Sequence, residues 1–182
     1  MHEKKLVLSK QVVDLNDPLL PLIEQTYVSS FPIEERRDFA LLKDLLMQNK
    51  SFRMYSLQRD GLYVGFITAW FFDGFNYVEH FAIDESVRNG GLGSISMSSF
   101  LSICTEPVVL EVELPLDEMS KRRIGFYERL GFKLDNHYYL QPPYRPEDSP
   151  FELRLMSYGD LDMDKSFEEV KNVIHRNVYG VK

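Results

Sequence analysis

The stretch Arg88–Ser94 reads R-N-G-G-L-G-S and stands between an apolar run, residues 77–83, and a helix-compatible run, residues 95–103. A strand, a glycine turn and a helix in this order form an anion site, because the free N–H groups at a helix start point outward and the helix dipole favours negative charge there. Gly90, Gly91 and Gly93 carry no Cβ atom that would keep a phosphate from the backbone. The same pattern also occurs in ordinary glycine-rich loops, so the surrounding sequence has to distinguish the two.

The composition describes a single-domain protein with an acidic surface. The chain has 182 residues, of which 44% are hydrophobic, and this suits one domain with a sizeable core. A formal net charge of −7 argues against a nucleic-acid partner, whose binding requires neutralisation of phosphates. The single cysteine, Cys104, excludes an intrachain disulfide and a cysteine-based metal site, and we expect no metal. We find neither a signal-peptide pattern nor an apolar run of about 20 residues, so we expect a cytoplasmic protein without a membrane partner.

Periodicity and turn residues predict a chain of alternating strands and helices. We expect strands at residues 6–13, 52–58, 62–72, 75–83, 108–114, 132–140 and 151–158, and helices at residues 18–30, 34–49, 94–103, 117–130 and 164–178. Short turns at Asp60-Gly61 and Asp73-Gly74 make the strands between residues 52 and 83 an antiparallel meander. The order predicts an α/β protein with one domain over residues 1–182, a mixed sheet with helices on both faces, and a helical extension from about residue 160.

Two motifs resemble those of the GCN5-related N-acetyltransferase (GNAT) superfamily. Its acyl-CoA signature, Q/R-x-x-G-x-G/A, is matched by Arg88, Gly91 and Gly93, and its F-Y-x-x-x-G-F motif is matched by residues 126–132. The element order resembles the family over about residues 1–160. The resemblance implies a GNAT-like fold with a central, mostly antiparallel sheet, and an enzyme that transfers an acetyl group from acetyl-CoA to a primary amine.

Other glycine-rich motifs fit this sequence less well. A P-loop requires a lysine after its last glycine, and none follows here. A Rossmann fingerprint follows the first strand of a parallel sheet, whereas here three antiparallel strands come first. A nucleotide hydrolase and a redox enzyme are therefore disfavoured.

The resemblance also implies which residues hold acetyl-CoA. The amides of the turn would bind the pyrophosphate, Arg88 would place that turn or add charge, and the preceding strand would pair with the pantetheine arm through its backbone. These cofactor-binding residues are Phe81, Ala82, Ile83, Arg88, Asn89, Gly90, Gly91, Leu92, Gly93 and Ser94. The chain has Lys121 and Arg123 where the family often has asparagine and alanine. Arg123 would replace the usual contact to CoA, or it belongs to a solvated helix face.

The expected chemistry needs a neutral amine and a proton for the leaving thiolate. Period two places Tyr77 and Glu79 on one face of their strand and His80 on the other, unless a bulge intervenes. Glu79 is the first candidate for the base. Tyr127 matches the position from which the family often protonates the thiolate, and a phenol with a pKa near about 10 stays protonated at neutral pH.

The resemblance implies that the strand of residues 108–114 splays away from the strand that ends at residue 83 and leaves a gap for the thioester, beside which the acceptor amine would lie. Tyr77, Glu111 and Glu113 are the residues expected to bind it, although the two glutamates are also compatible with a solvent-facing pair. The Pro-rich segment Q-P-P-Y, residues 141–144, stiffens its backbone and presents Tyr144 toward the same site.

Three functions remain open from the sequence. The first is acetyl transfer in a ternary complex, with a small molecule or an amino terminus as acceptor. The second is a non-catalytic acyl-CoA-binding or regulatory module, against which Glu79 and Tyr127 argue. The third is a structural protein with an incidental glycine turn, which would not bind acetyl-CoA. A homodimer is also compatible with the sequence.

Overall fold

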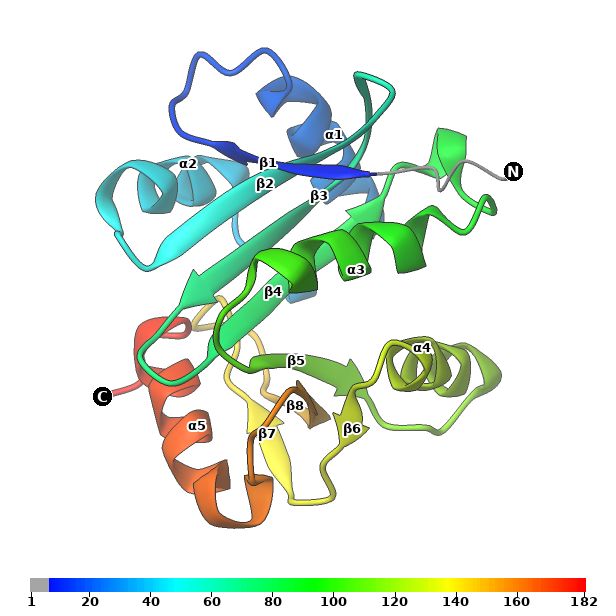
Figure 1. Ribbon diagram of the computed structural model, residues 1–182. Helices are drawn as coiled ribbons and strands as arrows, with labels where there is room; N and C mark the ends of the chain where they lie inside the picture. The colour runs from blue at the N-terminus through cyan, green and yellow to red at the C-terminus, as the bar shows by residue number, and fades with distance from the viewer. Residues whose placement is uncertain (1–6) are drawn as a thin grey trace.

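The structure, a computed structural model, describes residues 7–182 and is built around one twisted sheet (Figure 1). The strands are β1 Leu8–Val12, β2 Phe52–Arg59, β3 Leu62–Phe71, β4 Asn76–Ile83, β5 Val108–Glu113, β6 Lys133–Leu134, β7 Tyr139–Gln141 and β8 Phe151–Tyr158. The helices are α1 Leu20–Ser30, α2 Phe39–Gln48, α3 Leu92–Ile103, α4 Glu118–Arg129 and α5 Met163–Asn177, with short 3₁₀ turns η1 Ile33–Glu35 and η2 Glu85–Val87. The strand order is β1-β2-β3-β4-β5-β8-β6, and β7 also pairs with β8. All these pairs are antiparallel except β4 with β5, which confirms the predicted α/β class and the mostly antiparallel sheet.

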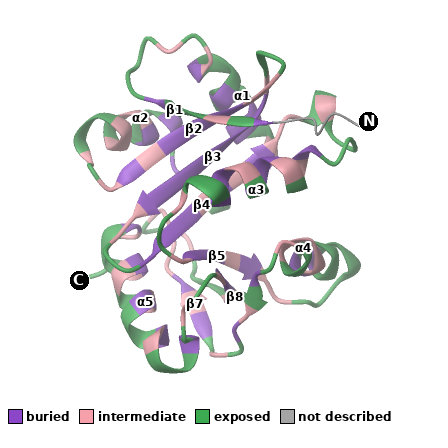
Figure 2. Cartoon of the chain, viewed as in Figure 1, coloured by how far each residue is buried: buried purple, intermediate pink, exposed green. Residues whose placement is uncertain are grey.

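Helices cover both faces of the sheet, as predicted. Helices α1, α2 and α5 lie on one face, where Ile23, Leu42 and Phe167 belong to the same core as Trp70 of β3. Helices α3 and α4 lie on the other face, where Phe100 belongs to a second core. Figure 2 shows the central strands buried and the outer surfaces of the helices exposed. No helix within residues 7–182 combines the length and the apolar character needed to cross a bilayer.

Strands β4 and β5 separate soon after they meet. Their parallel pairing joins residues 76–78 of β4 to residues 108–110 of β5 and extends no further. Strand β5 continues to Glu113 with β8 as its partner, and β4 continues to Ile83 with β3 as its partner. The β5-facing edge of residues 79–83 is therefore open, and this opening positions the site.

A β-bulge in β4 corrects one prediction. Thr68 of β3 pairs with His80 and Ala69 pairs with Val78, so that Glu79 is the extra residue. Because a bulge interrupts the alternation of side chains, Glu79 and His80 both point to the face covered by α1, α2 and α5. The prediction that His80 lies on the opposite face from Glu79 is therefore wrong.

Helices α1 and α2 begin later than predicted. Helix α2 begins at Phe39 and not at residue 34, because Arg36 and the residues after it are extended and the N–H of Arg37 donates to the hydroxyl of Tyr27. Helix α1 begins at Leu20, since the Asp17 carboxylate accepts a hydrogen bond from the N–H of Leu19 before the helix starts.

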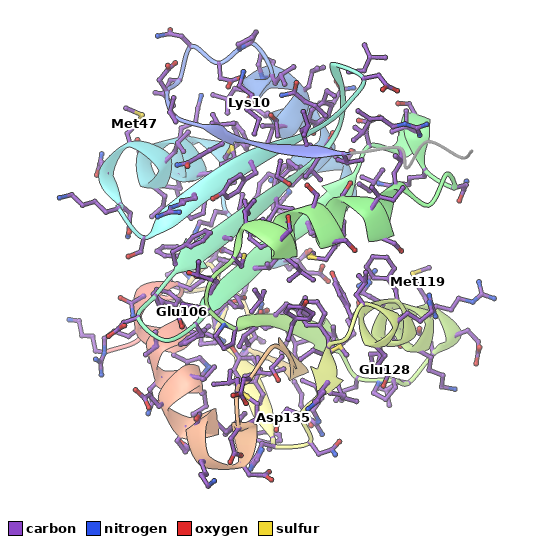
Figure 3. The ribbon with its side chains drawn as sticks, viewed as in Figure 1. Lys10, Met47, Glu106, Met119, Glu128 and Asp135 are labelled. Carbon is purple, nitrogen blue, oxygen red and sulfur yellow. The ribbon has the colours of Figure 1, made fainter. Side chains whose placement is uncertain are left out.

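The predicted strand 132–140 is interrupted. Within this segment, only β6 and β7 pair with β8. The residues between them turn around Asp135, which is labelled in Figure 3. The Asp135 N–H donates to the carbonyl of Leu155, and its carboxylate pairs with His137 at 2.8 Å. These bonds replace strand pairing over residues 135–138.

We expect Gly65→Ala to destabilise the protein by about 1–3 kcal/mol. A Cβ atom at Gly65 would overlap the backbone carbonyl oxygen of Ala82 and lie 3.0 Å from the Cα of Ile83, and backbone atoms in a central strand cannot move away cheaply. Urea unfolding measures the change. Gly90→Ala is the matched control, since its added Cβ would meet only Leu92 at 3.9 Å and should change the free energy of unfolding by less than about 0.5 kcal/mol. Equal effects of the two substitutions would contradict the prediction.

Candidate active site

The glycine turn leaves the start of α3 free to bind an anion. Gly91 is the residue before the helix, with a left-handed φ of 70°, and no side chain caps the helix there. Asn89 is also left-handed, with a φ of 75°. Residues 88–91 are exposed. The first N–H groups of a twelve-residue helix thus face outward without a side-chain partner, which suits a phosphate group.

Arg88 and Asp84 hold this turn against the rest of the fold. The Arg88 guanidinium donates from Nε to the carbonyl of Ile83 at 2.9 Å and from Nη2 to the hydroxyl of Ser30 at 3.1 Å. The Asp84 carboxylate accepts a hydrogen bond from Thr26 of α1 at 2.9 Å. Arg88 therefore joins the end of β4 to the end of α1, in line with the turn-placing role considered for it.

A cleft of about 670 Å³ lies where β4 and β5 separate. It is lined by residues 78–83 of β4, residues 110–114 of β5 and side chains from both faces of the sheet. The structure brings most of the predicted site residues to it: Glu79, Phe81, Ala82, Ile83, Arg88, Glu111, Glu113, Arg123, Tyr127 and Tyr144. A larger cavity of about 1030 Å³ lies beyond Arg88, between α1 and the β2–β3 turn, and none of the predicted catalytic residues lines it.

Glu79 lies at the bottom of the cleft, and both oxygens of its carboxylate accept hydrogen bonds. Its side chain has 0% exposed surface and forms an ion pair with Arg37 at 2.9 Å, and the Arg37 side chain is only 8% exposed. The indole N–H of Trp70 donates to Oε2 at 2.6 Å, and the hydroxyl of Tyr144 donates to Oε1 at 2.9 Å. Tyr144 also lines the cleft, so both partners of this hydrogen bond border the same space.

Glu111 lies on β5 in a set of donors that are all neutral. The hydroxyl of Tyr139 donates to Oε1, while Gln141 and the hydroxyl of Tyr179 donate to Oε2 at 2.7 and 2.8 Å. Burial raises the pKa of Glu111. The expected acceptor contact Tyr77 is 1% exposed, belongs to the core and does not line the cleft. Its hydroxyl lies 3.3 Å from that of Tyr179.

Tyr127 lines the cleft from the other face of the sheet. Its ring packs against Phe126 and Phe132, with centroid distances of 5.0 and 5.4 Å. Burial raises the pKa of Tyr127 to about 12. The phenol therefore remains a proton donor throughout the neutral range.

Glu113 and Arg123 face each other at the mouth of the cleft. Their side chains form an ion pair at 2.8 Å, and each is about half exposed. Arg123 thus stands on an exposed helix face and is paired with Glu113. Any contact that it makes to CoA has to compete with Glu113.

Sequence reasoning missed five residues of the site: Arg37, Trp70, Tyr139, Gln141 and Tyr179. Arg37 falls inside a segment that was predicted to be helical, and Tyr179 lies beyond both motifs. Neither residue belongs to a periodic pattern or to a motif, so only the tertiary arrangement brings them to the two glutamates. Gln141 was the one with a usable signal, because it opens the Pro-rich segment that was already expected at the acceptor site.

The fold and the cleft define an acyl-CoA acetyltransferase of the GNAT type. The model of the acetyltransferase (GNAT) family matches residues 16–132, and the chain belongs to this family. Its predicted membership is thereby confirmed.

Solved structures agree with this assignment. A protein from Bacteroides thetaiotaomicron assigned to the GNAT family is 42% identical, with a TM-score of 0.87 over 89% of this chain and 92% of that one. The ribosomal-protein-S18-alanine N-acetyltransferase of Escherichia coli is 18% identical, with a TM-score of 0.57 over 84% and 93%. A spermidine N-acetyltransferase chimera from Vibrio cholerae and hSSAT is 12% identical, with a TM-score of 0.60 over 84% and 94%. The last two likenesses show the fold alone. Among curated proteins, no sequence match was found.

Proposed function

We propose that the protein transfers an acetyl group from acetyl-CoA to a primary amine by direct attack in a ternary complex. The cleft between β4 and β5 supports this proposal, because an open strand edge, a buried carboxylate and a phenol line it, and Arg88 at its end leads into the uncapped start of α3. Acetyl-CoA supplies a thioester whose carbonyl carbon is open to a neutral amine.

The turn residues bind the pyrophosphate of acetyl-CoA in this proposal. The N–H groups of Leu92, Gly93 and Ser94 begin α3 and are the donors, and the helix dipole adds to the attraction. The open backbone edge of residues 81–83 pairs with the pantetheine arm, as an added strand pairs with a sheet edge. Arg88 keeps this edge and the turn together through its bond to the carbonyl of Ile83.

Two side chains move the protons. As the new N–C bond forms and the C–S bond breaks, the amine loses one proton and the thiolate gains one. The amine proton passes to the oxygen of Tyr144 while the hydroxyl proton of Tyr144 passes to Glu79, along the 2.9 Å hydrogen bond between them. Tyr127 donates its phenolic proton to the departing sulfur. No covalent intermediate with the enzyme is needed.

Acetyl-CoA-dependent turnover tests the function. We expect acetyl-CoA to raise the melting temperature, since a ligand that binds only the folded state stabilises it, and we expect CoA release to depend on added amine. Stabilisation without release on any amine would instead support a non-catalytic acyl-CoA-binding module. The absence of any stabilisation would contradict the acyl-CoA site itself.

We expect Glu79→Gln to lower kcat by about 100-fold, because the amide keeps the shape of the side chain but cannot take up the proton. The measurement is steady-state CoA release by protein whose folding is verified from its melting curve. Glu113→Gln is the matched control, since Glu113 lines the same cleft but is half exposed at its mouth, and it should retain kcat within about threefold. A larger loss in Glu113→Gln than in Glu79→Gln would exclude Glu79 as the base.

A further inference from the structure

Two segments of the chain border the acceptor side of the cleft. The α1–α2 connection, residues 31–38, contributes Phe31 and Glu35 to the lining. The Pro-rich loop, residues 142–150, contributes Tyr144. Both segments lie on the face of the sheet where the Glu79 side chain points, which is the face opposite Tyr127 and α4.

Arg145 fastens these two segments to each other. Its Nη1 donates to the carbonyl of Ile33 and, at 3.3 Å, to the carbonyl of Arg36. Its Nη2 forms an ion pair with Asp38 at 3.0 Å. The Arg145 side chain is 20% exposed, so most of it is packed into this junction. Three partners on one connection make a bridge and not a chance surface contact.

Tyr144, the residue before Arg145, contacts the residues at the bottom of the cleft, where its hydroxyl donates to Glu79. The Arg37 guanidinium lies 4.7 Å from the centre of the Tyr144 ring, and the His80 ring stacks with the Tyr144 ring at a centroid distance of 6.1 Å. Below the ring, the Glu79 side chain has no exposed surface. The segment after α5 contacts the same group, because Arg37 also donates to the carbonyl of Val178 at 2.5 Å.

The acceptor end of the cleft is thus bordered by two segments, the α1–α2 connection and the Pro-rich loop, which Arg145 joins. A polypeptide acceptor has to place its first residue at Glu79 and lead the rest of its chain out between the segments that border the site. Here Phe31 and Glu35 of the α1–α2 connection and Tyr144 of the Pro-rich loop line the cleft, and the contacts of Arg145 join these two segments beside it. The cleft of about 670 Å³ also has to hold the acetyl group and part of the pantetheine arm, so the acceptor shares this volume with them.

We infer that the acceptor is a small primary amine and not the amino terminus of a polypeptide, because Arg145 and Tyr144 hold the Pro-rich loop across the acceptor path. This inference rests on the proposed acetyltransferase function and narrows its substrate class. It selects one of the two acceptor classes that were left open by the sequence.

The test compares acceptors that share one reacting group. Purified protein is assayed for CoA release with alaninamide, phenethylamine and putrescine, and with pentapeptides that begin with alanine or another small residue. We expect at least one small amine to be acetylated, with every peptide at least about 100-fold lower in kcat/KM than the best small amine. A peptide with kcat/KM equal to or above that of the best small amine would overturn the inference and leave the proposed function standing. Transfer to no amine at all would overturn the proposed function, and this inference with it.

The bridge is tested by its removal. In Arg145→Ala, the ratio of peptide kcat/KM to small-amine kcat/KM should rise at least tenfold. Asp38→Asn loses only one of the contacts, at an exposed side chain, so this ratio should rise by less. Arg59→Ala is the matched control, because Arg59 is 22% exposed, pairs with Asp60 at the β2–β3 turn and lies outside the cleft. An unchanged ratio in folded Arg145→Ala and Asp38→Asn would show that the bridge does not select the acceptor.

Discussion

Tyr127→Phe should lower kcat by about 100-fold and leave the affinity for acetyl-CoA unchanged. The substitution removes only the hydroxyl, and the ring keeps its packing against Phe126 and Phe132. The enzyme then has to release the thiolate without a donor at that position. Steady-state kinetics measure kcat, and calorimetric titration with acetyl-CoA measures the affinity.

The control for Tyr127→Phe is Tyr158→Phe. Tyr158 packs on Phe132 at 5.4 Å in the same aromatic cluster, but it does not line the cleft, so the loss of its hydroxyl should leave kcat within about twofold. The wild-type pH profile gives a second check. Because the pKa of Tyr127 is raised to about 12, its deprotonation should cause no fall in kcat between pH values of about 8 and 10. A Tyr127→Phe variant with the wild-type kcat would remove this residue from the acid role.

Arg37→Met should lower the free energy of unfolding by about 3–5 kcal/mol. The arginine is the cationic partner of Glu79, and both side chains are nearly or fully inaccessible to solvent. Removal of one partner leaves the other as an uncompensated charge in the interior. The same substitution also deletes the bond to the Val178 carbonyl. Urea or thermal unfolding measures the loss.

A double variant separates the charge effect from lost packing. Arg37→Met combined with Glu79→Gln should be more stable than Arg37→Met alone, because no unpaired charge remains. Arg59→Ala removes an arginine whose ion-pair partner Asp60 is 87% exposed, and it should cost less than about 1 kcal/mol. A loss below about 1 kcal/mol in Arg37→Met would mean that Glu79 does not depend on this partner.

Local features of the site could be predicted from the sequence because neighbouring residues determine them. The glycine turn begins α3 two residues before the predicted start, and Gly91 adopts the left-handed conformation that suits glycine. Helix α4 begins after Asp117, whose side chain forms a capping box with Ser120, and it ends just before Gly131, whose φ is 97°. These signals lie within a few residues of the features that they specify.

The surroundings of the two glutamates could not be predicted in the same way. Arg37 and Glu79 are 42 positions apart, and Tyr179 and Glu111 are 68 apart. Nothing in the spacing of either pair indicates a contact, because the contacts depend on how α5 and the α1–α2 connection pack on the sheet. The bulge at Glu79 also depends on how β3 and β4 pair, and a strand pattern read alone does not contain that information.

The bulge in β4 makes the proposed base, Glu79, an extra residue that has no partner in β3. On one side of Glu79, Tyr77 points to the first core and Val78 to the second; on the other side, Ala82 and Ile83 do the same. If residue 79 were deleted, Val78 and His80 would become neighbours and every remaining side chain would keep its face, since Ala69 and Thr68 are already consecutive opposite them. The sheet therefore does not need Glu79. The proposed base occupies a surplus position of the strand, so the alternation of side chains on β4 does not constrain it, and its exchange concerns its buried partners Arg37, Trp70 and Tyr144.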